Sequence, residues 1–258
     1  MIIKVGCCGF PGGMSKYFNK YKLVEVQQTF YKPPKPTTLR RWRESAPEDF
    51  EFSVKAWQII THPSTSPTYR KAKISLSDED LRNAGYFRNH KVVIDAWNIT
   101  KEACKILGSK ICVFQTPSSF KPTDDNISNM KTFFSQIDRD GLILGWEPRG
   151  KDWKDDIIKD ICERLKIIHI VDPFANDPLH VENKIMYFRL HGMPPGNRMY
   201  NYKYTVKDFD FLIEKLKTFE QEFNIEEVYF LFNNIYMGDD AAAFIKYLEK
   251  KKQYQFLK

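Results

Sequence analysis

Short runs of apolar and β-branched residues recur along the chain, and longer segments with helical spacing separate them. Most of these runs end in a polar or charged residue. Runs of this length, bounded by turn residues, are typical of buried strands, so the pattern predicts eight strands. The predicted strands cover residues 2–7, 23–27, 50–55, 111–115, 142–147, 167–171, 185–191 and 228–233.

Capping residues and apolar periodicity mark helices between most of the strands. The alternation predicts a parallel TIM-type eight-stranded β/α barrel, irregular around strands six and seven, where no helix is evident. The length of 258 residues matches one such barrel, so a single domain over 1–258 is expected. The predicted helices are 36–46, 92–107, 127–137 capped by Thr123 or Asp124, 153–165 capped by Asp152, 206–223 capped by Thr205, and 239–248.

Two connections are unusual. Within the connection from strand three to strand four, residues 57–89 are polar, contain proline and are rich in Ser, Thr and Tyr, and a Gly/Pro loop over 192–200 follows strand seven. Both follow a strand, so we expect them to overhang the barrel mouth as lids or substrate walls; surface elaboration is the alternative. The polar composition of 57–89 predicts few apolar contacts and greater mobility than in the barrel.

Polar residues at the strand ends predict one site. In a parallel β/α barrel the C-terminal ends of all strands meet at the same mouth, where the active sites of such enzymes lie. Glu25, Lys55, Glu147 and His191 each end a predicted strand or lie near its end, and we assign them to catalysis. The residues assigned to substrate binding are Gln27, His62, Gln115, Arg149, Asp172, Arg189, Asn233 and Asn234.

Each catalytic assignment has an alternative. Glu25 or Glu147 can act as a general base, but the two could also bind a cation, and Glu25 could form a structural network with Lys55. His191 can act as an acid near neutral pH, or it can be a core histidine. Loops after strands seven and eight are the usual phosphate site of this fold, so an anion is expected near Arg189 and Asn233.

The charge balance favours anionic partners. The chain has 40 basic and 33 acidic residues, a net charge of +7, with clusters at 40–43 and 250–252. A solvated basic surface explains this excess, and so does a footprint for phosphate or nucleic acid if the charge gathers on one face. The expected partners are therefore an anionic small molecule or a nucleic acid.

Cysteine usage and hydropathy suggest the compartment. The five cysteines lie in or beside apolar segments, which predicts buried thiols and a reducing compartment. No CxxC pair or HExxH motif occurs, so no metal site is predicted. The sequence does not identify a cofactor. Because no apolar stretch approaches about 20 residues and Met1 leads directly into a strand, we expect a cytoplasmic protein with no membrane partner.

Taken together, several segments resemble the uncharacterised YecE-like family (domain of unknown function 72). The resemblance covers nearly the whole chain and implies a TIM-type barrel of undetermined activity. The segments that carry it are Val5-Gly6-Cys7-Cys8-Gly9-Phe10, Val24-Glu25-Val26-Gln27-Gln28-Thr29-Phe30-Tyr31, Phe52-Ser53-Val54-Lys55-Ala56 with Thr61-His62, Phe114-Gln115-Thr116-Pro117-Ser118-Ser119-Phe120, Glu147-Pro148-Arg149, Tyr187-Phe188-Arg189-Leu190-His191-Gly192 and Phe232-Asn233-Asn234.

The departures from the family pattern bear on the site. The family usually has Thr-Ser-Gly-Trp in place of Cys7-Cys8-Gly9-Phe10, Asn in place of Gln27, and a Phe-Arg-His-Pro-like run in place of 148–151. This chain therefore lacks the histidine that the family places after Arg149. The residues that match the family pattern are Glu25, Lys55, Gln115, Glu147, Arg189, His191 and Asn233.

Two functions are compatible with these observations. The first is an enzyme acting on a phosphate-bearing or nucleic-acid-derived substrate, with Lys55, Arg149 and Arg189 holding anionic groups. The second is a non-catalytic nucleic-acid-binding protein that uses basic clusters and exposed aromatic rings. The rings expected to be exposed are Tyr69, Tyr86, Phe87, Tyr200, Tyr202 and Tyr204.

Overall fold

Eight strands form at the predicted places. The structure is a computed structural model that describes residues 1–194, 199–251 and 255–257. The strands are β1 (Ile2–Cys7), β2 (Leu23–Val26), β3 (Glu51–Lys55), β4 (Ile111–Gln115), β5 (Ile143–Glu147), β6 (Ile168–His169), β7 (Ile185–Leu190), β8 (Glu227–Phe232) and an unpredicted β9 (Gln255–Leu257). Their order is β6-β5-β4-β3-β2-β1-β8-β7, with β9 paired to β1.

The strand order confirms the predicted parallel β/α barrel. β1 pairs in parallel with β8 from Ile2↔Glu227 to Cys7↔Phe232, and β4 pairs in parallel with β5. The predicted irregularity is also present: β6 has only two residues, and a single parallel bridge joins Val171 to Phe188 of β7.

Helices follow most of the strands, and some of them begin at a residue other than the predicted one. Thr123 caps α8 by accepting from the backbone N–H of Asn126, and Thr205 forms a capping box with Asp208 at α10. Asp152 does not cap a helix, because its carboxylate pairs with Lys121 and the helix begins at Asp155. The helices are α1 (Met14–Phe18), α2 (Gln28–Tyr31), α3 (Pro36–Ser45), α4 (Gln58–Thr61), α5 (Pro67–Ala72), α6 (Asp78–Asn83), α7 (Lys91–Leu107), α8 (Asp124–Gln136), α9 (Asp155–Leu165), α10 (Val206–Glu222) and α11 (Met237–Lys251).

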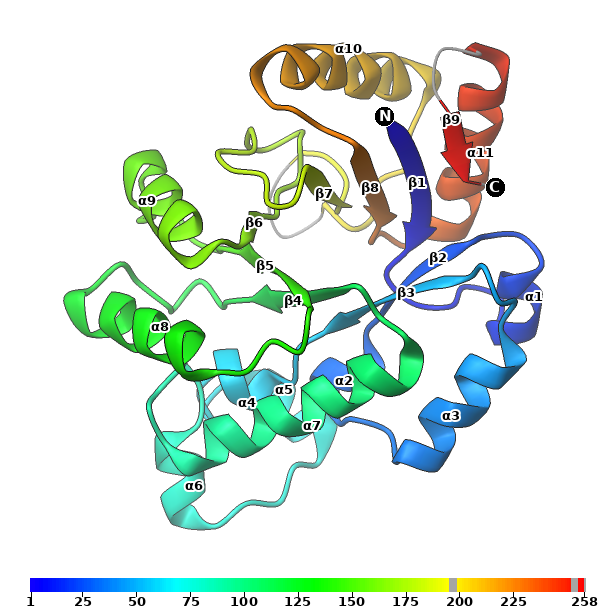
Figure 1. The fold of residues 1–258 in the computed structure, drawn as a ribbon. Helices are drawn as coiled ribbons and strands as arrows, with labels where there is room; N and C mark the ends of the chain where they lie inside the picture. The colour runs from blue at the N-terminus through cyan, green and yellow to red at the C-terminus, as the bar shows by residue number, and fades with distance from the viewer. Residues whose placement is uncertain (195–198, 252–254, 258) are drawn as a thin grey trace. The chain divides into compact units, whose positions relative to one another are not determined.

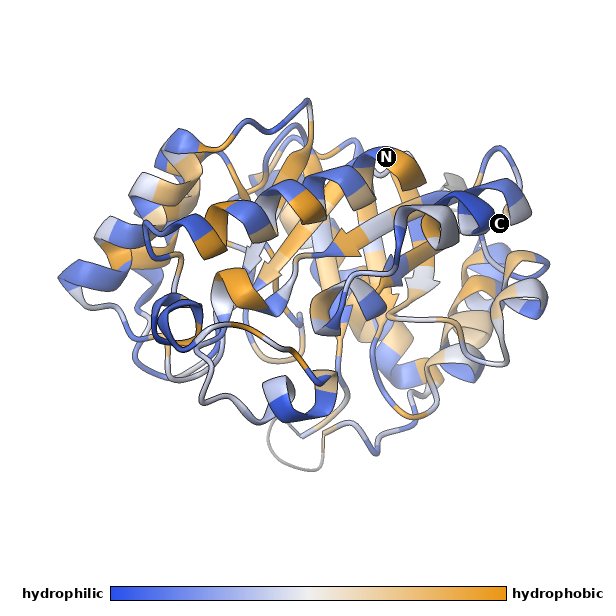
Figure 2. Cartoon of the chain, turned by 90° about the horizontal axis from the view of Figure 1, so that it is seen from below, coloured by the Kyte–Doolittle hydropathy of each residue, from blue (hydrophilic) through white to orange (hydrophobic). Residues whose placement is uncertain are grey.

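Contacts group the chain into two compact units. Unit 1 consists of Met1–Glu25, Ser45–Glu51 and Ile168–Lys258, and in it α11 packs against β1, β8 and α10 (Figure 1). Unit 2 consists of Val26–Glu44 and Phe52–Ile167. The strands are hydrophobic and the helices carry a hydrophobic and a hydrophilic face (Figure 2), as burial against a sheet requires. The single domain over 1–258 stays a prediction.

Residues 57–89 were expected to make few apolar contacts, and this expectation is wrong. The segment contains α4, α5 and α6, and Ile59, Ile60 and Phe87 are buried. The backbone N–H groups of Gly85 and Phe87 donate to the carbonyls of Ile59 and Ile60, which ties the two ends together. Gly85 has a φ of 85°, and a Cβ there would lie 2.4 Å from the backbone of His62.

The segment is therefore expected to exchange its amide hydrogens unevenly. Residues 59–62 and 84–87 should be protected, because their backbone groups are bonded and their apolar side chains are buried. Residues 71–77, none of whose side chains is buried, should exchange much faster. Hydrogen-exchange mass spectrometry measures this directly. Uniformly fast exchange across 57–89 would contradict the packing and restore the original expectation.

No helix among the residues that the structure describes is long and apolar enough to cross a bilayer.

Candidate functional site

A buried ion pair forms the centre of the candidate site in unit 1. Arg189 in β7 donates from Nε and Nη2 to the two carboxylate oxygens of Glu25, at 3.0 and 2.9 Å. The Tyr187 hydroxyl donates to the same carboxylate at 2.9 Å. Both charged side chains have 0% of their surface exposed. Such fork-to-fork pairing satisfies much of the hydrogen-bonding capacity of both ions, which burial requires.

This arrangement changes the roles expected from the sequence. A carboxylate that accepts three hydrogen bonds is poorly placed to take a proton from a substrate, and a guanidinium paired in this way has less capacity for an anion. Glu25 and Arg189 therefore fit a positioning role better than the base and anion-binding roles first assigned. Arg189 Nη2 also lies 3.7 Å from the Cys8 sulfur, a contact that sequence reasoning missed.

His191 is held by groups on both sides. Its backbone N–H donates to Asp172 Oδ2 at 2.8 Å, and Asn233 Nδ2 lies 3.1 Å from its Nδ1. With the amide in this orientation its nitrogen donates, so Nδ1 accepts and a neutral imidazole carries its proton on Nε2. The His191 ring is 1% exposed and meets Tyr200 edge-on, at 5.6 Å between ring centroids. Asp172 and Asn233, two of the predicted binding residues, thus both contact His191 in unit 1.

Two residues that were predicted to bind substrate, Asn234 and Gln27, have structural positions in the fold. Asn234 donates from Nδ2 to Asp240 and to the carbonyl of Tyr202, both at 2.6 Å, so it braces the loops after β7 and β8. Gln27 was predicted to end the strand over 23–27, but β2 ends at Val26 and Gln27 takes the N-cap position of α2 with helical dihedrals.

Unit 2 contains a row of polar side chains at the C-terminal ends of β3, β4 and β5. Lys55 Nζ donates to Gln115 Oε1 at 2.8 Å, and Gln115 pairs in register with Glu147 on the neighbouring strand. Arg149 Nη2 lies 2.7 Å from Glu147 Oε1. Each of Lys55, Gln115 and Glu147 is the last residue of its strand, which is why the sequence pattern could locate them. We call these four residues the Lys55 row.

His62 lies beside the Lys55 row. Its ring meets Phe30 edge-on at 4.9 Å, and the Lys55 ammonium lies 4.1 Å from the centre of the same Phe30 ring. Thr61 Oγ1 is 2.8 Å from His62 Nδ1. Burial, and secondarily the charge of Lys55, lowers the pKa of His62 to about 3. At neutral pH this histidine is therefore an uncharged hydrogen-bonding group and adds no positive charge to the site.

The predicted residues thus form separate groups within each unit. Unit 1 brings Glu25 together with Arg189, and His191 together with Asn233 and Asp172. Unit 2 contains the Lys55 row and His62. The convergence of all these residues in one cavity stays a prediction.

A second charged network, built on the buried Lys4, lies at the opposite strand ends of unit 1. Lys4 pairs with Glu51 and with Glu227, and the Tyr229 hydroxyl is within 3.0 Å of both Lys4 Nζ and Glu227 Oε2. Glu51 and Glu227 are the first residues of β3 and β8. In β/α barrels the N-terminal face contributes to stability, so we assign this network to the fold.

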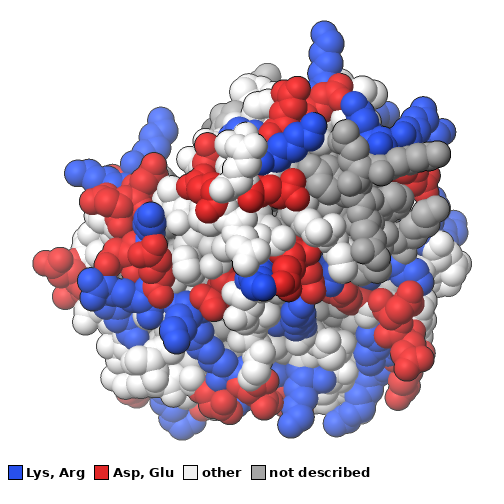
Figure 3. Space-filling view, turned by 45° about the horizontal axis from the view of Figure 1, so that its top comes forward, with Lys and Arg blue, Asp and Glu red and all other residues white. Residues whose placement is uncertain are grey.

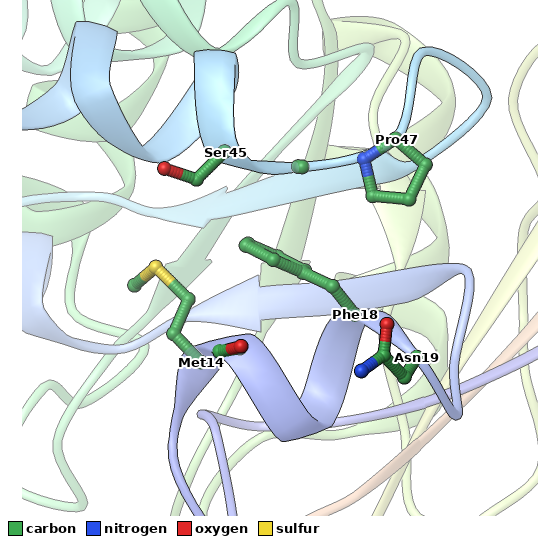
Figure 4. Close-up of a pocket in the computed structure, with 7 residues that line it drawn as sticks. Met14, Phe18, Asn19, Ser45 and Pro47 are labelled. Carbon is green, nitrogen blue, oxygen red and sulfur yellow. The ribbon is translucent and has the colours of Figure 1, made fainter.

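A pocket of about 570 Å³ in unit 1 is unrelated to the predicted residues. Figure 4 shows Met14, Phe18 and Asn19 of the α1 region facing Ser45 and Pro47. These residues come from α1, its C-terminal flank and the chain that precedes β3, and no charged side chain lines the pocket. It therefore offers no charged group to an anion, although Ser15, Asn19 and Ser45 line it.

The charges on one face and the burial of the aromatic rings bear on the predicted nucleic-acid footprint. On the face drawn in Figure 3, basic and acidic side chains are interspersed. Three of the rings expected to be exposed are in fact buried, with exposed fractions of 6% for Tyr69, 0% for Phe87 and 5% for Tyr204. Tyr200 is exposed, at 41%. Apolar neighbours in the fold, such as Phe232 beside Tyr204, explain the burial.

All five cysteine side chains are buried and none forms a disulfide. Within residues 1–194, 199–251 and 255–257, no three His, Cys, Asp or Glu side chains are grouped so that they could hold a metal ion.

Comparison with known structures supports the fold. A DUF72 family protein from Enterococcus faecalis shares 19% identity over 97% of this chain and 98% of its own, with a TM-score of 0.71. Another from Thermotoga maritima shares 20% identity over 96% and 100%, with a TM-score of 0.66. A 3-keto-D-glucoside 4-epimerase from E. coli shares 12% identity over 97% and 99%, with a TM-score of 0.55. At these identities the likeness shows the fold alone.

The family comparison is more direct. No curated protein matches the chain. The model of the family described as "Protein of unknown function DUF72" matches residues 11–257, which is nearly the whole sequence and includes every candidate site residue. This agrees with the motifs from Glu25 to Asn234 that suggested the resemblance. The chain therefore belongs to the DUF72 family.

Proposed function

We propose that the protein is an enzyme that binds an anionic, phosphate-bearing substrate and moves protons on it. The observation that supports this most strongly is the Lys55 row, in which two cationic side chains are fixed at strand ends by an amide and a carboxylate. Fixed cations suit phosphate binding, and the C-terminal strand ends are where the active sites of β/α barrels lie.

Proton transfer has a candidate group in each unit. Glu147 is buried, at 3% exposed, and pairs through Oε1 with Arg149, and we assign its carboxylate the role of the base. In unit 1, His191 presents Nε2–H as a donor while Asn233 occupies Nδ1. The sequence predicts that His191 serves the same substrate as the acid.

Inorganic phosphate is expected to stabilise the wild-type protein and to stabilise a Lys55→Met variant much less. At ten times its dissociation constant, a ligand of the folded state contributes about 1.4 kcal/mol, which corresponds to a rise of about 3–5 °C in melting temperature. Thermal melts across a phosphate titration at fixed ionic strength measure this. Lys101→Met, at a lysine of α7 paired with Asp138, is the control and should keep the wild-type response.

The catalytic part of the proposal needs a second readout. A panel of sugar phosphates and nucleoside monophosphates is incubated with the protein and followed by NMR. Glu147→Gln should keep the phosphate-induced rise in melting temperature and lose conversion of any substrate that the wild type turns over. A wild-type midpoint that does not move with phosphate, or an equal rise in Lys55→Met, contradicts the proposal.

A further inference from the structure

Four neighbouring residues hold His62 in one orientation within unit 2. Its backbone N–H donates to the carbonyl of Gln58 at 2.7 Å, and its own carbonyl accepts from the Tyr69 hydroxyl at 3.0 Å. The ring meets Phe30 edge-on, and Thr61 Oγ1 lies 2.8 Å from Nδ1. The backbone and one ring nitrogen are therefore both fixed, which also fixes the direction of the other ring nitrogen, Nε2.

The hydrogen bond between Thr61 and His62 has one favourable direction. Thr61 is 1% exposed, and among the residues that the structure describes its hydroxyl is bonded only to His62. If Nδ1 carried the ring proton, it would donate to Thr61, and the hydroxyl proton would be buried without an acceptor, which is unfavourable. The Thr61 hydroxyl is therefore the donor and Nδ1 the acceptor.

This direction places the ring proton of His62 on Nε2. Burial, with the charge of Lys55, holds the pKa of His62 at about 3, so at neutral pH the ring has a single proton. Because Nδ1 accepts from Thr61, that proton is on Nε2 and the group is a neutral hydrogen-bond donor.

The Nε2–H group lies near Lys55 and keeps contact with solvent. His62 Nε2 makes no hydrogen bond within residues 1–194, 199–251 and 255–257, and it is not among the side-chain atoms there that are fully buried without a partner. The Lys55 ammonium lies 4.1 Å from the centre of the Phe30 ring that His62 also contacts. A donor beside a fixed ammonium suits an oxygen of a phosphate, since hydrogen bonds to an anion are strong.

We propose that Thr61 is a positioning residue that holds His62 as the Nε2–H tautomer, so that His62 binds the phosphate of the substrate as a neutral donor beside Lys55. This inference rests on the proposed function, because it assumes that phosphate binds at the Lys55 row. It adds Thr61 to the site and gives the direction of the hydrogen bond from His62.

Nitrogen NMR of the histidine rings in isotopically labelled protein tests the tautomer at neutral pH without a ligand. Protonated and unprotonated ring nitrogens resonate in separate ranges, and the signals of His62 are those missing from His62→Gln. We expect Nε2 to be protonated in the wild type and in Thr61→Ser, and Thr61→Val to show a mixture of both tautomers. Thr100→Val, which removes another buried hydroxyl of unit 2, is the control and should keep the wild-type pattern.

Calorimetric titration with inorganic phosphate at fixed ionic strength tests the donor. His62→Phe keeps a ring without a donor and should bind phosphate about tenfold more weakly than the wild type. Thr61→Val should bind about threefold more weakly, because the ring proton is no longer held on Nε2. Thr61→Ser restores the hydroxyl and should restore the affinity, and His62→Gln, with its amide N–H, should bind more tightly than His62→Phe. Thr100→Val should match the wild type.

The outcomes separate this inference from the proposed function. An Nδ1–H tautomer in the wild type overturns the inference, and so does equal phosphate affinity in the wild type and His62→Phe; in both cases the proposed function stands if Lys55→Met loses the binding. No phosphate binding by the wild type overturns both. An equal loss of affinity in Thr100→Val also overturns the inference, because the effect would then come from any buried hydroxyl. If Thr61→Val does not fold, the wild-type tautomer and the affinity of His62→Phe decide the matter.

Discussion

Replacing Arg189 with methionine is expected to lower the free energy of unfolding by about 3–5 kcal/mol. The guanidinium satisfies both oxygens of Glu25, and neither side chain is exposed to water. Removing it leaves a buried carboxylate without its cation, and the cost is the desolvation of that charge. Urea unfolding measures the loss as a shift in midpoint at constant slope.

Two further variants identify the cause. Arg164→Met removes an exposed partner of Asp160 in α9 and should cost less than about 0.5 kcal/mol, which controls for the loss of an arginine as such. A Glu25→Met/Arg189→Met double variant removes both charges and should be more stable than Arg189→Met, because no buried ion is left unpaired. If the free energy of unfolding of Arg189→Met lay within about 1 kcal/mol of the wild-type value, the pair would not stabilise the fold.

The strand ends could be predicted from the sequence because a period of two fixes which side chains share a face. Tyr187, Arg189 and His191 alternate along one segment, and Lys55 and Glu147 each terminate an apolar run. These positions are local properties of the chain. The pairing between these residues is not a local property, because Glu25 and Arg189 are 164 residues apart in the chain and meet only in the folded protein.

The same limit explains the assignments that changed. Glu25 was expected to be a base, but three donors reach its carboxylate from β7, and no local pattern shows this. Asp152 has the residue type of a helix cap, but it pairs with Lys121 from another connection. In each case a distant partner overrode a sound local preference.

The average composition of residues 57–89 does not show which of their side chains are buried. The segment is polar overall, but its few apolar residues, such as Ile59, Ile60 and Phe87, are the ones that fold inward. Burial depends on the placement of those residues, and the average over a segment hides it. The same reason explains the burial of Tyr69, because a tyrosine in a polar stretch can still pack against a neighbouring loop. Its hydroxyl donates to the carbonyl of His62.

The wild-type protein is expected to lose stability through His62 as the pH falls below about 6.5. The pKa of His62 is about 3 in the folded protein, because of burial and the nearby Lys55 charge, and an unfolded histidine titrates near 6.5. Between these values the unfolded chain binds a proton that the folded chain does not, so stability falls as pH falls. The contribution is fully present above about pH 6.5, and about 2–3 kcal/mol of it is lost by pH 4.5.

A His62→Gln variant isolates this effect. Glutamine stays neutral, so its free energy of unfolding should fall less steeply than that of the wild type between pH 6.5 and 4.5, whatever its value at pH 7. His90→Gln, at the partly exposed cap of α7, is the histidine control. Parallel curves for the wild type and His62→Gln would mean that His62 titrates alike in both states. That result would contradict the assignment of His62 as an uncharged group beside the Lys55 row. A charged His62 would instead act as an additional anion-binding group.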